Sequence, residues 1–283
     1  MARRLGFGDR RSLVDRTMTV LCGLCLLAAF FPLGSLLTMV ISRGLPSLSW
    51  TFLTGLPKPV GELGGGVGNG LVGSALLTLM AASIGIPAGV GAGLYLASHG
   101  DGVFGQAVRF LAEVLSAVPS VVIGLAVYGL VVAPLHHFSA MAGGLALAIL
   151  MIPTLARSTE EVVKLVPHAL FEGALALGVP RWRASLLVVT RSALGGIATA
   201  VCLALSRAAG ETAPLLFTAL ANQFWNVRPD QPTASLPVQI YNYAISPYKD
   251  WQAQAWGAAL VLLLFVGALN LAAKLISRRA TFA

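Results

Sequence analysis

The 283-residue sequence is 57% hydrophobic and only 11% charged, and its mean hydropathy is +0.81. Soluble domains carry about 25% charged residues, so these values exclude an ordinary soluble globular protein. The net charge of +8 comes from basic residues that cluster beside apolar segments rather than interleaving with aromatic residues. This arrangement argues against nucleic-acid binding and favours a membrane protein.

A membrane-spanning helix needs about 20 mainly apolar residues. Six segments are candidates, and they predict an all-α transmembrane fold: 20–41, 71–96, 111–133, 141–156, 194–220 and 256–276. The resulting division of the chain is an N-terminal tail (1–19), a first transmembrane helix (20–42), an external loop (43–70), a five-helix core (71–276) with an inner loop (157–191), and a C-terminal tail (277–283).

The distribution of positive charge predicts the orientation of these spans. With six spans, both termini and two loops share one side, and that side receives 14 Lys and Arg residues against 4 on the other side. Basic residues accumulate on the cytoplasmic side of membrane proteins. We therefore expect both termini in the cytoplasm, with the first span serving as an uncleaved signal anchor.

Motifs for metal, redox or nucleotide chemistry are weak or absent in the sequence. Cys22 and Cys25 fit C-x-x-C, but they lie in an apolar run without the βαβ pattern that supports a redox site. The four histidines have no metal-ligand spacing. No Gly-Lys pair occurs, so a phosphate-binding P-loop is excluded. We expect no cofactor, no metal and no ATP site in this chain.

The inner loop 157–191 is charged, yet its apolar residues follow a helical pattern. Pro167 and Pro180 should divide it into short helices along the membrane surface. From the pattern alone, a plain interfacial helix explains the loop. The run 172–182, however, resembles the "EAA" loop of ABC importer permeases, which forms a coupling helix on the ATPase subunit. That resemblance assigns ATPase coupling to Glu172, Gly173, Ala174 and Gly178, although Gly173 replaces the usual alanine.

A more specific resemblance covers the chain from about residue 71 onward. The runs 118–125, 207–220, 222–225 and 236–241 are similar to the A-type permease subunits of phosphate-specific ABC importers. This resemblance implies a six-helix type I ABC importer permease fold in the bacterial inner membrane. It also implies several partners: a second permease subunit, two copies of a cytoplasmic ABC ATPase, and an external phosphate-binding protein.

Arg207 and Glu211 are the strongest candidates for contact with phosphate. Arg207 lies near the middle of the fifth predicted span, where an arginine costs about 2.5–3.5 kcal/mol unless it faces protein or a polar cavity. Glu211 follows four residues later on the same predicted helix face, and the resemblance adds Thr212. A guanidinium can donate two parallel hydrogen bonds to an oxyanion. An internal Arg207–Glu211 ion pair without substrate contact is the alternative.

Three other functions compete with phosphate import. A permease for another oxyanion, such as molybdate or sulfate, would share the topology and the coupling loop. An ion-driven secondary transporter would need no ATPase, but no convincing internal repeat is visible. A membrane-embedded enzyme is disfavoured because no span carries a catalytic constellation; Glu113, for example, is expected to form a structural i,i+4 pair with Arg109.

Overall fold

The computed structural model describes residues 7–62 and 64–281, and every regular element within these ranges is a helix. Five helices are long and apolar enough to cross a membrane, and one bent helix pair raises this number to six. The chain is therefore a multi-pass membrane protein. Arg3 and Arg4, which contribute to the predicted inner charge, lie outside the described residues.

The centre of the fold is the long contact between α3 (Gly68–His99) and α7 (Ala140–Lys164). Glycines spaced four residues apart on α3 face α7, and α7 is the most buried of the candidate spans. A Cβ added at Gly89 would lie 2.5 Å from the Cβ of Leu155, and one added at Gly93 would lie 2.5 Å from the Cβ of Thr159. Without a hydrophobic driving force in lipid, close backbone approach of this kind is what holds helices together.

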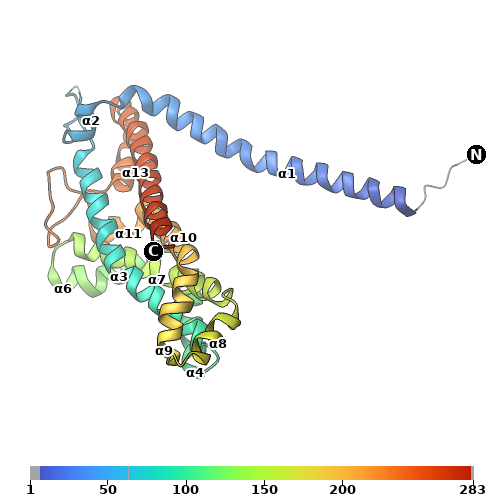
Figure 1. Ribbon diagram of the computed structural model, residues 1–283. Coiled ribbons are helices and arrows are strands. Elements are labelled where there is room, and N and C mark those ends of the chain that lie inside the picture. Colours follow the sequence, from blue (N-terminus) through green and yellow to red (C-terminus); the bar gives the residue numbers. More distant parts are fainter. Residues whose placement is uncertain (1–6, 63, 282–283) are drawn as a thin grey trace, which may run out of the picture.

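Two further helices complete this core. α10 (Thr190–Gly210) packs against α7 and α3, and α13 (Lys249–Thr281) packs against α10. Short helices lie at the two ends of the molecule (Figure 1). At one end are α2 (Trp50–Thr54) and α12 (Leu236–Ala244); at the other are α8 (His168–Ala176) and α9 (Arg181–Arg183).

The third predicted span, 111–133, is not one straight helix. α4 (Val103–Ala117) and α5 (Ser120–Val127) meet at a bend of 104°. The bend falls at Val118 and Pro119, because proline lacks an N–H and forces an extended backbone on the preceding residue. α5 continues through the π-helix η2 (Tyr128–Val132) into α6 (Ala133–Leu135).

The fifth predicted span, 194–220, is also wrong as a single helix. The helical stretch begins earlier, at α9 and the π-helix η3 (Ala184–Val189), and α10 ends at Gly210. Glu211 is extended, and a separate helix, α11 (Ala213–Thr218), follows. Pro214 explains the break, because its ring would clash with the carbonyl of Gly210 in a continuous helix.

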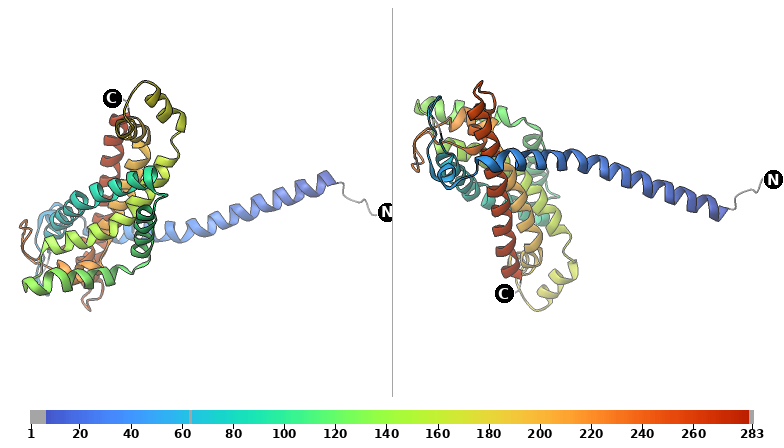
Figure 2. Two further views of the ribbon diagram at one scale, coloured as in Figure 1. Left: turned by 90° about the horizontal axis from the view of Figure 1, so that it is seen from below. Right: turned by 90° about the horizontal axis from the view of Figure 1, so that it is seen from above.

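Helix α1 (Phe7–Gly44) projects away from the rest of the fold (Figures 1 and 2). Its helical part starts well before the predicted apolar span, within the tail assigned to 1–19. The 3₁₀ turn η1 (Leu45–Ser47) follows it. The end of α1 packs closely against α13 at Gly44. A Cβ added to Gly44 would lie 2.7 Å from the carbonyl oxygen of Trp256. The remaining apolar surface of α1 is exposed and therefore open to lipid or to another subunit.

Candidate functional site

Arg207 and Glu211 lie at the break between α10 and α11. Arg207 is in the last turn of α10, and Glu211 is the extended residue that ends this helix. The two residues therefore do not share one continuous helix face, as their spacing predicted. Their side chains nevertheless approach each other, with 3.6 Å between Arg207 Nε and Glu211 Oε1. That distance is ion-pair contact, but it is too long for a hydrogen bond.

The exposure of the two side chains is unequal. The Arg207 side chain is 60% exposed, whereas that of Glu211 is 18% exposed. The C-terminal end of a helix carries partial negative charge, which favours a cation at the position of Arg207. With its guanidinium open on one side and held only loosely by Glu211, Arg207 can still donate hydrogen bonds to a ligand.

A small cleft lies beside this pair, between α10 and α7. Its lining consists of Leu150, Met151, Thr154, Ala204, Arg207, Ala208 and Glu211. Residues 150–154 are at the middle of α7. Arg207 thus lies at the depth of the centre of a spanning helix, although it is at the end of its own helix. Ala208 and Ala209 are buried, while an added Cβ at Gly210 would meet no atom within 4 Å.

Thr212 and α11 complete this region. Thr212 is half-buried at the start of α11, and its carbonyl oxygen accepts hydrogen bonds from Leu215 N and Leu216 N. α11 is held against α5 by a close approach, because a Cβ added at Gly124 would lie 2.6 Å from the Cα of Pro214. The segments 118–125 and 207–220, singled out separately in the sequence, therefore pack together in the fold.

The predicted coupling residues form an exposed helix at the opposite end from α2. Pro167 and Pro180 precede α8 and α9, as expected. Glu172 and Gly173 are exposed on α8, whereas Ala174 is buried. α8 packs against η3, so Ala174 lies on the side that attaches the helix to the protein.

Gly178 has a specific structural role at the end of α8. Its φ of +80° is left-handed, a conformation that glycine adopts without steric cost. Gly178 N donates to Leu175 O at 2.9 Å, and Val179 N donates to Ala174 O at 3.1 Å. These two bonds are a Schellman motif, which satisfies the last carbonyl groups of the helix.

The structure corrects the expected Arg109–Glu113 pair. Arg109 Nη2 instead donates to Glu160 Oε1 at 2.6 Å, and Glu113 lies 3.7 Å from Arg157. Glu160, which is only 2% exposed, also accepts from Lys164 Nζ at 2.6 Å and lies 3.6 Å from Arg157. Sequence reasoning missed Glu160. Its i,i+3 and i,i+4 spacing to Arg157 and Lys164 was a usable signal.

The comparisons with known proteins agree with this fold. Residues 85–282 match the family described as binding-protein-dependent transport system inner membrane component. The chain is 42% identical to the phosphate transport system permease protein PstA of Yersinia pestis, covering 93% of this chain and 89% of the relative. It is 44% identical to PstA of Xylella fastidiosa (94% and 93% covered), and 35% identical to a probable PstA of Methanocaldococcus jannaschii (90% of each).

A solved structure of the inward-facing MetNI methionine ABC transporter shares the fold. The match has a TM-score of 0.59 at 19% identity and covers 76% of this chain and 94% of the other. The comparison at this identity establishes the type I ABC importer permease architecture and nothing about the substrate. About a quarter of this chain lies outside the match.

Proposed function

The chain belongs to the family of binding-protein-dependent transport system inner membrane components, and we propose that it is the permease subunit through which an ATP-driven importer moves phosphate. The observation that carries this proposal is the similarity to phosphate transport permeases over about nine-tenths of the chain. Arg207, open at mid-membrane depth beside α7, supplies a chemical reason for the choice of an oxyanion.

Arg207 and Glu211 have complementary roles in this proposal. The guanidinium of Arg207 donates hydrogen bonds to two phosphate oxygens, and Glu211 accepts a hydrogen bond from a protonated phosphate oxygen. Sulfate has no proton to offer at neutral pH, so Glu211 disfavours it. Thr212, at the adjacent start of α11, offers a hydroxyl within the same region.

Transport follows from alternating access in a complex of several subunits. α8 docks on a cytoplasmic ABC ATPase through its exposed Glu172 face, and a second permease subunit completes the path. An external phosphate-binding protein delivers the substrate at the opposite end, near α2 and α12. The chain hydrolyses no ATP itself; the ATPase partner does.

Reconstitution of the assembled complex in lipid vesicles tests this function. We expect uptake of labelled phosphate that requires ATP and the binding protein, and that excess sulfate or molybdate does not inhibit. Uptake of molybdate or sulfate in place of phosphate would identify a permease for another oxyanion. Uptake driven by an ion gradient without the ATPase would contradict the proposal altogether.

A further inference from the structure

Asn270 is a polar residue in an otherwise apolar stretch of α13. The other residues in 261–273 are all apolar or glycine. A side-chain amide within a membrane span needs a partner in the protein, because lipid offers no hydrogen bonds. Ser206 on α10 provides it, since its hydroxyl donates to Asn270 Oδ1 at 2.7 Å. The same hydroxyl lies 2.7 Å from the carbonyl oxygen of Cys202, so the contact reaches the backbone of α10 as well.

The side of α10 that carries Ser206 differs from the side that carries Arg207. Ala204 and Ala208 are buried and line the cleft against α7. An α-helix turns about 100° per residue, so Ser206 lies on the opposite side from these alanines, toward α13. Arg207 lies between the two sides. A rotation of α10 about its own axis would therefore carry Arg207 toward α7 or toward α13.

Few contacts oppose such a rotation at the end of α10. The alanines on the α7 side allow close approach, but their methyl groups form no directional bond. Glu211 lies beyond the last turn in extended backbone, so its ion contact with Arg207 does not anchor the helix. From residue 199 to the end of α10, the side-chain hydrogen bonds that reach another long helix of the described chain both end on Asn270, one from Cys202 Sγ and one from Ser206 Oγ.

We propose that Asn270 is a positioning residue for Arg207. Its bond with Ser206 fixes the rotation of the last turn of α10, and with it the direction in which the guanidinium opens beside α7. This inference rests on the proposed function for the role of Arg207. A bond that only held two helices together would stabilise the complex without setting how well it transports phosphate.

Ser206→Thr and Ser206→Val separate these two roles. Threonine and valine have the same shape, but only threonine keeps the hydroxyl. In vesicles that contain the assembled complex, the ATP hydrolysed per phosphate transported is measured. The valine variant should raise this ratio by about threefold or more, the factor equivalent to an average polar bond between membrane helices. ATP hydrolysis itself should continue, because α8 is unchanged.

The threonine variant should keep the wild-type ratio. An unchanged ratio in Ser206→Val, with or without a loss of thermal stability, would show that the bond only joins the helices, and the proposal would be wrong. A rise of the same size in Ser206→Thr would also overturn it, because the hydroxyl would then not be the cause.

A labelling experiment measures the position of residue 207 without any need for transport. Arg207→Cys is placed in a chain whose three native cysteines are replaced by alanine, and the complex in lipid nanodiscs is treated with a polar thiol reagent. Adding Asn270→Leu should change the labelling rate by about threefold or more, since the helix end is free to rotate. An unchanged rate would contradict the proposal.

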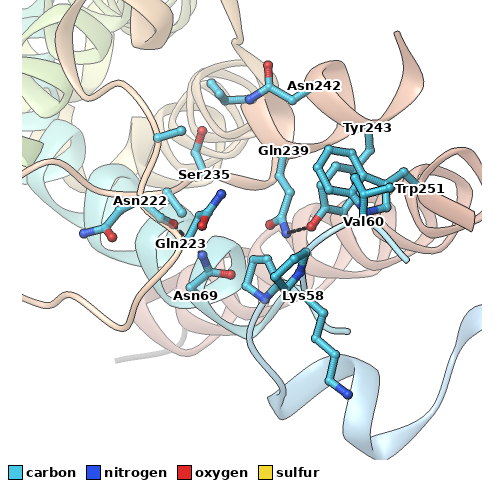
Figure 3. A pocket seen from close by; sticks show the side chains of 15 residues that line it. Lys58, Val60, Asn69, Asn222, Gln223, Ser235, Gln239, Asn242, Tyr243 and Trp251 are labelled. Carbon is cyan, nitrogen blue, oxygen red and sulfur yellow. Dashed lines mark hydrogen bonds between the residues drawn. The ribbon is translucent and has the colours of Figure 1, made fainter. Parts of the chain in front are cut away.

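Two controls accompany this labelling. Thr199→Cys, also exposed, lies near Gly196, where α10 packs closely against Val162 of α7; its labelling rate should not respond to Asn270→Leu. Asn242→Leu makes the same amide-to-leucine change on α12, in the lining of a cavity at the end near α2 (Figure 3). It should leave the labelling of residue 207 unchanged, and an equal effect of both leucine variants would overturn the assignment to Asn270.

Uptake of phosphate by the wild-type complex is measured before any variant. Its absence would count against the proposed function, whereas the labelling rates would still decide whether Asn270 sets the position of residue 207.

Discussion

The buried carboxylate of Glu160 connects two helices through charge. It accepts from Arg109 on α4 and from Lys164 on its own helix α7, with Arg157 nearby. α4 makes its main helix contact with α7, so this ion-pair cluster fixes the position of α4 before the 104° bend. Removing a single carboxylate would leave several cations without their shared counter-ion.

Glu160→Gln should therefore lower the free energy of unfolding by about 3 kcal/mol, as expected when one partner of a buried ion pair is removed. Denaturant unfolding of the purified chain in detergent measures this loss. Glu161→Gln is the control, because the neighbouring Glu161 is exposed and surface changes usually stay within about 0.5 kcal/mol. Equal losses in the two variants would show that Glu160 has no special role.

Sequence spacing could predict only part of this cluster. The partners of Glu160 on its own helix follow from i,i+3 and i,i+4 rules, whereas Arg109 lies 51 residues away. Local spacing favoured the wrong pair, Arg109 with Glu113, because it could not include the packing of α4 on α7. The Arg207–Glu211 contact was predicted, although the helix break between them was not.

The C-terminal end of the short helix α8 depends on the backbone conformation of Gly178. Gly178 closes it in a left-handed conformation, which asparagine and aspartate tolerate better than other residues. The variants Gly178→Asn and Gly178→Asp should both keep the turn, but they differ by one negative charge. That charge is unfavourable at the C-terminal end of a helix and on a docking surface that loses water.

We expect Gly178→Asp to reduce ATPase association at least tenfold and Gly178→Asn to retain most of it. The measurement is the amount of ATPase that co-purifies with the chain, with membrane insertion checked separately. Normal ATPase stoichiometry and transport in the aspartate variant would argue against α8 as the docking helix.

Hydropathy found the spanning segments but not their interruptions. Apolar composition places residues 111–133 and 194–220 in the membrane, and both regions are apolar and helical in the structure. The breaks at Pro119 and before Pro214 depend on backbone geometry, which a hydropathy average does not contain. The second break lies at Glu211, beside Arg207, and so shapes the proposed phosphate site.

Across the whole molecule, the orientation in the membrane remains a prediction. Single cysteines on a background without Cys22, Cys25 and Cys202 would test it. Glu62→Cys and Phe224→Cys lie at the end near α2, whereas Leu177→Cys and Val103→Cys lie at the α8 end, and all four positions are exposed. A membrane-impermeant thiol reagent added outside intact cells should label only the first two. Labelling of Leu177→Cys from outside would reverse the orientation.

The proposed passage of phosphate past Arg207 can be tested with a double variant of Arg207 and Glu211. Arg207→Lys keeps the charge but loses the planar donor pair, so it should retain little transport, and Arg207→Met should abolish transport. If the residue served only to balance Glu211, then Arg207→Met combined with Glu211→Gln would remove both charges and restore function.

Phosphate uptake into vesicles that contain the assembled complex is the deciding measurement. We expect the double variant to insert and assemble normally, yet to transport phosphate no better than Arg207→Met alone. Recovery of uptake in the double variant would contradict a role for Arg207 in binding phosphate.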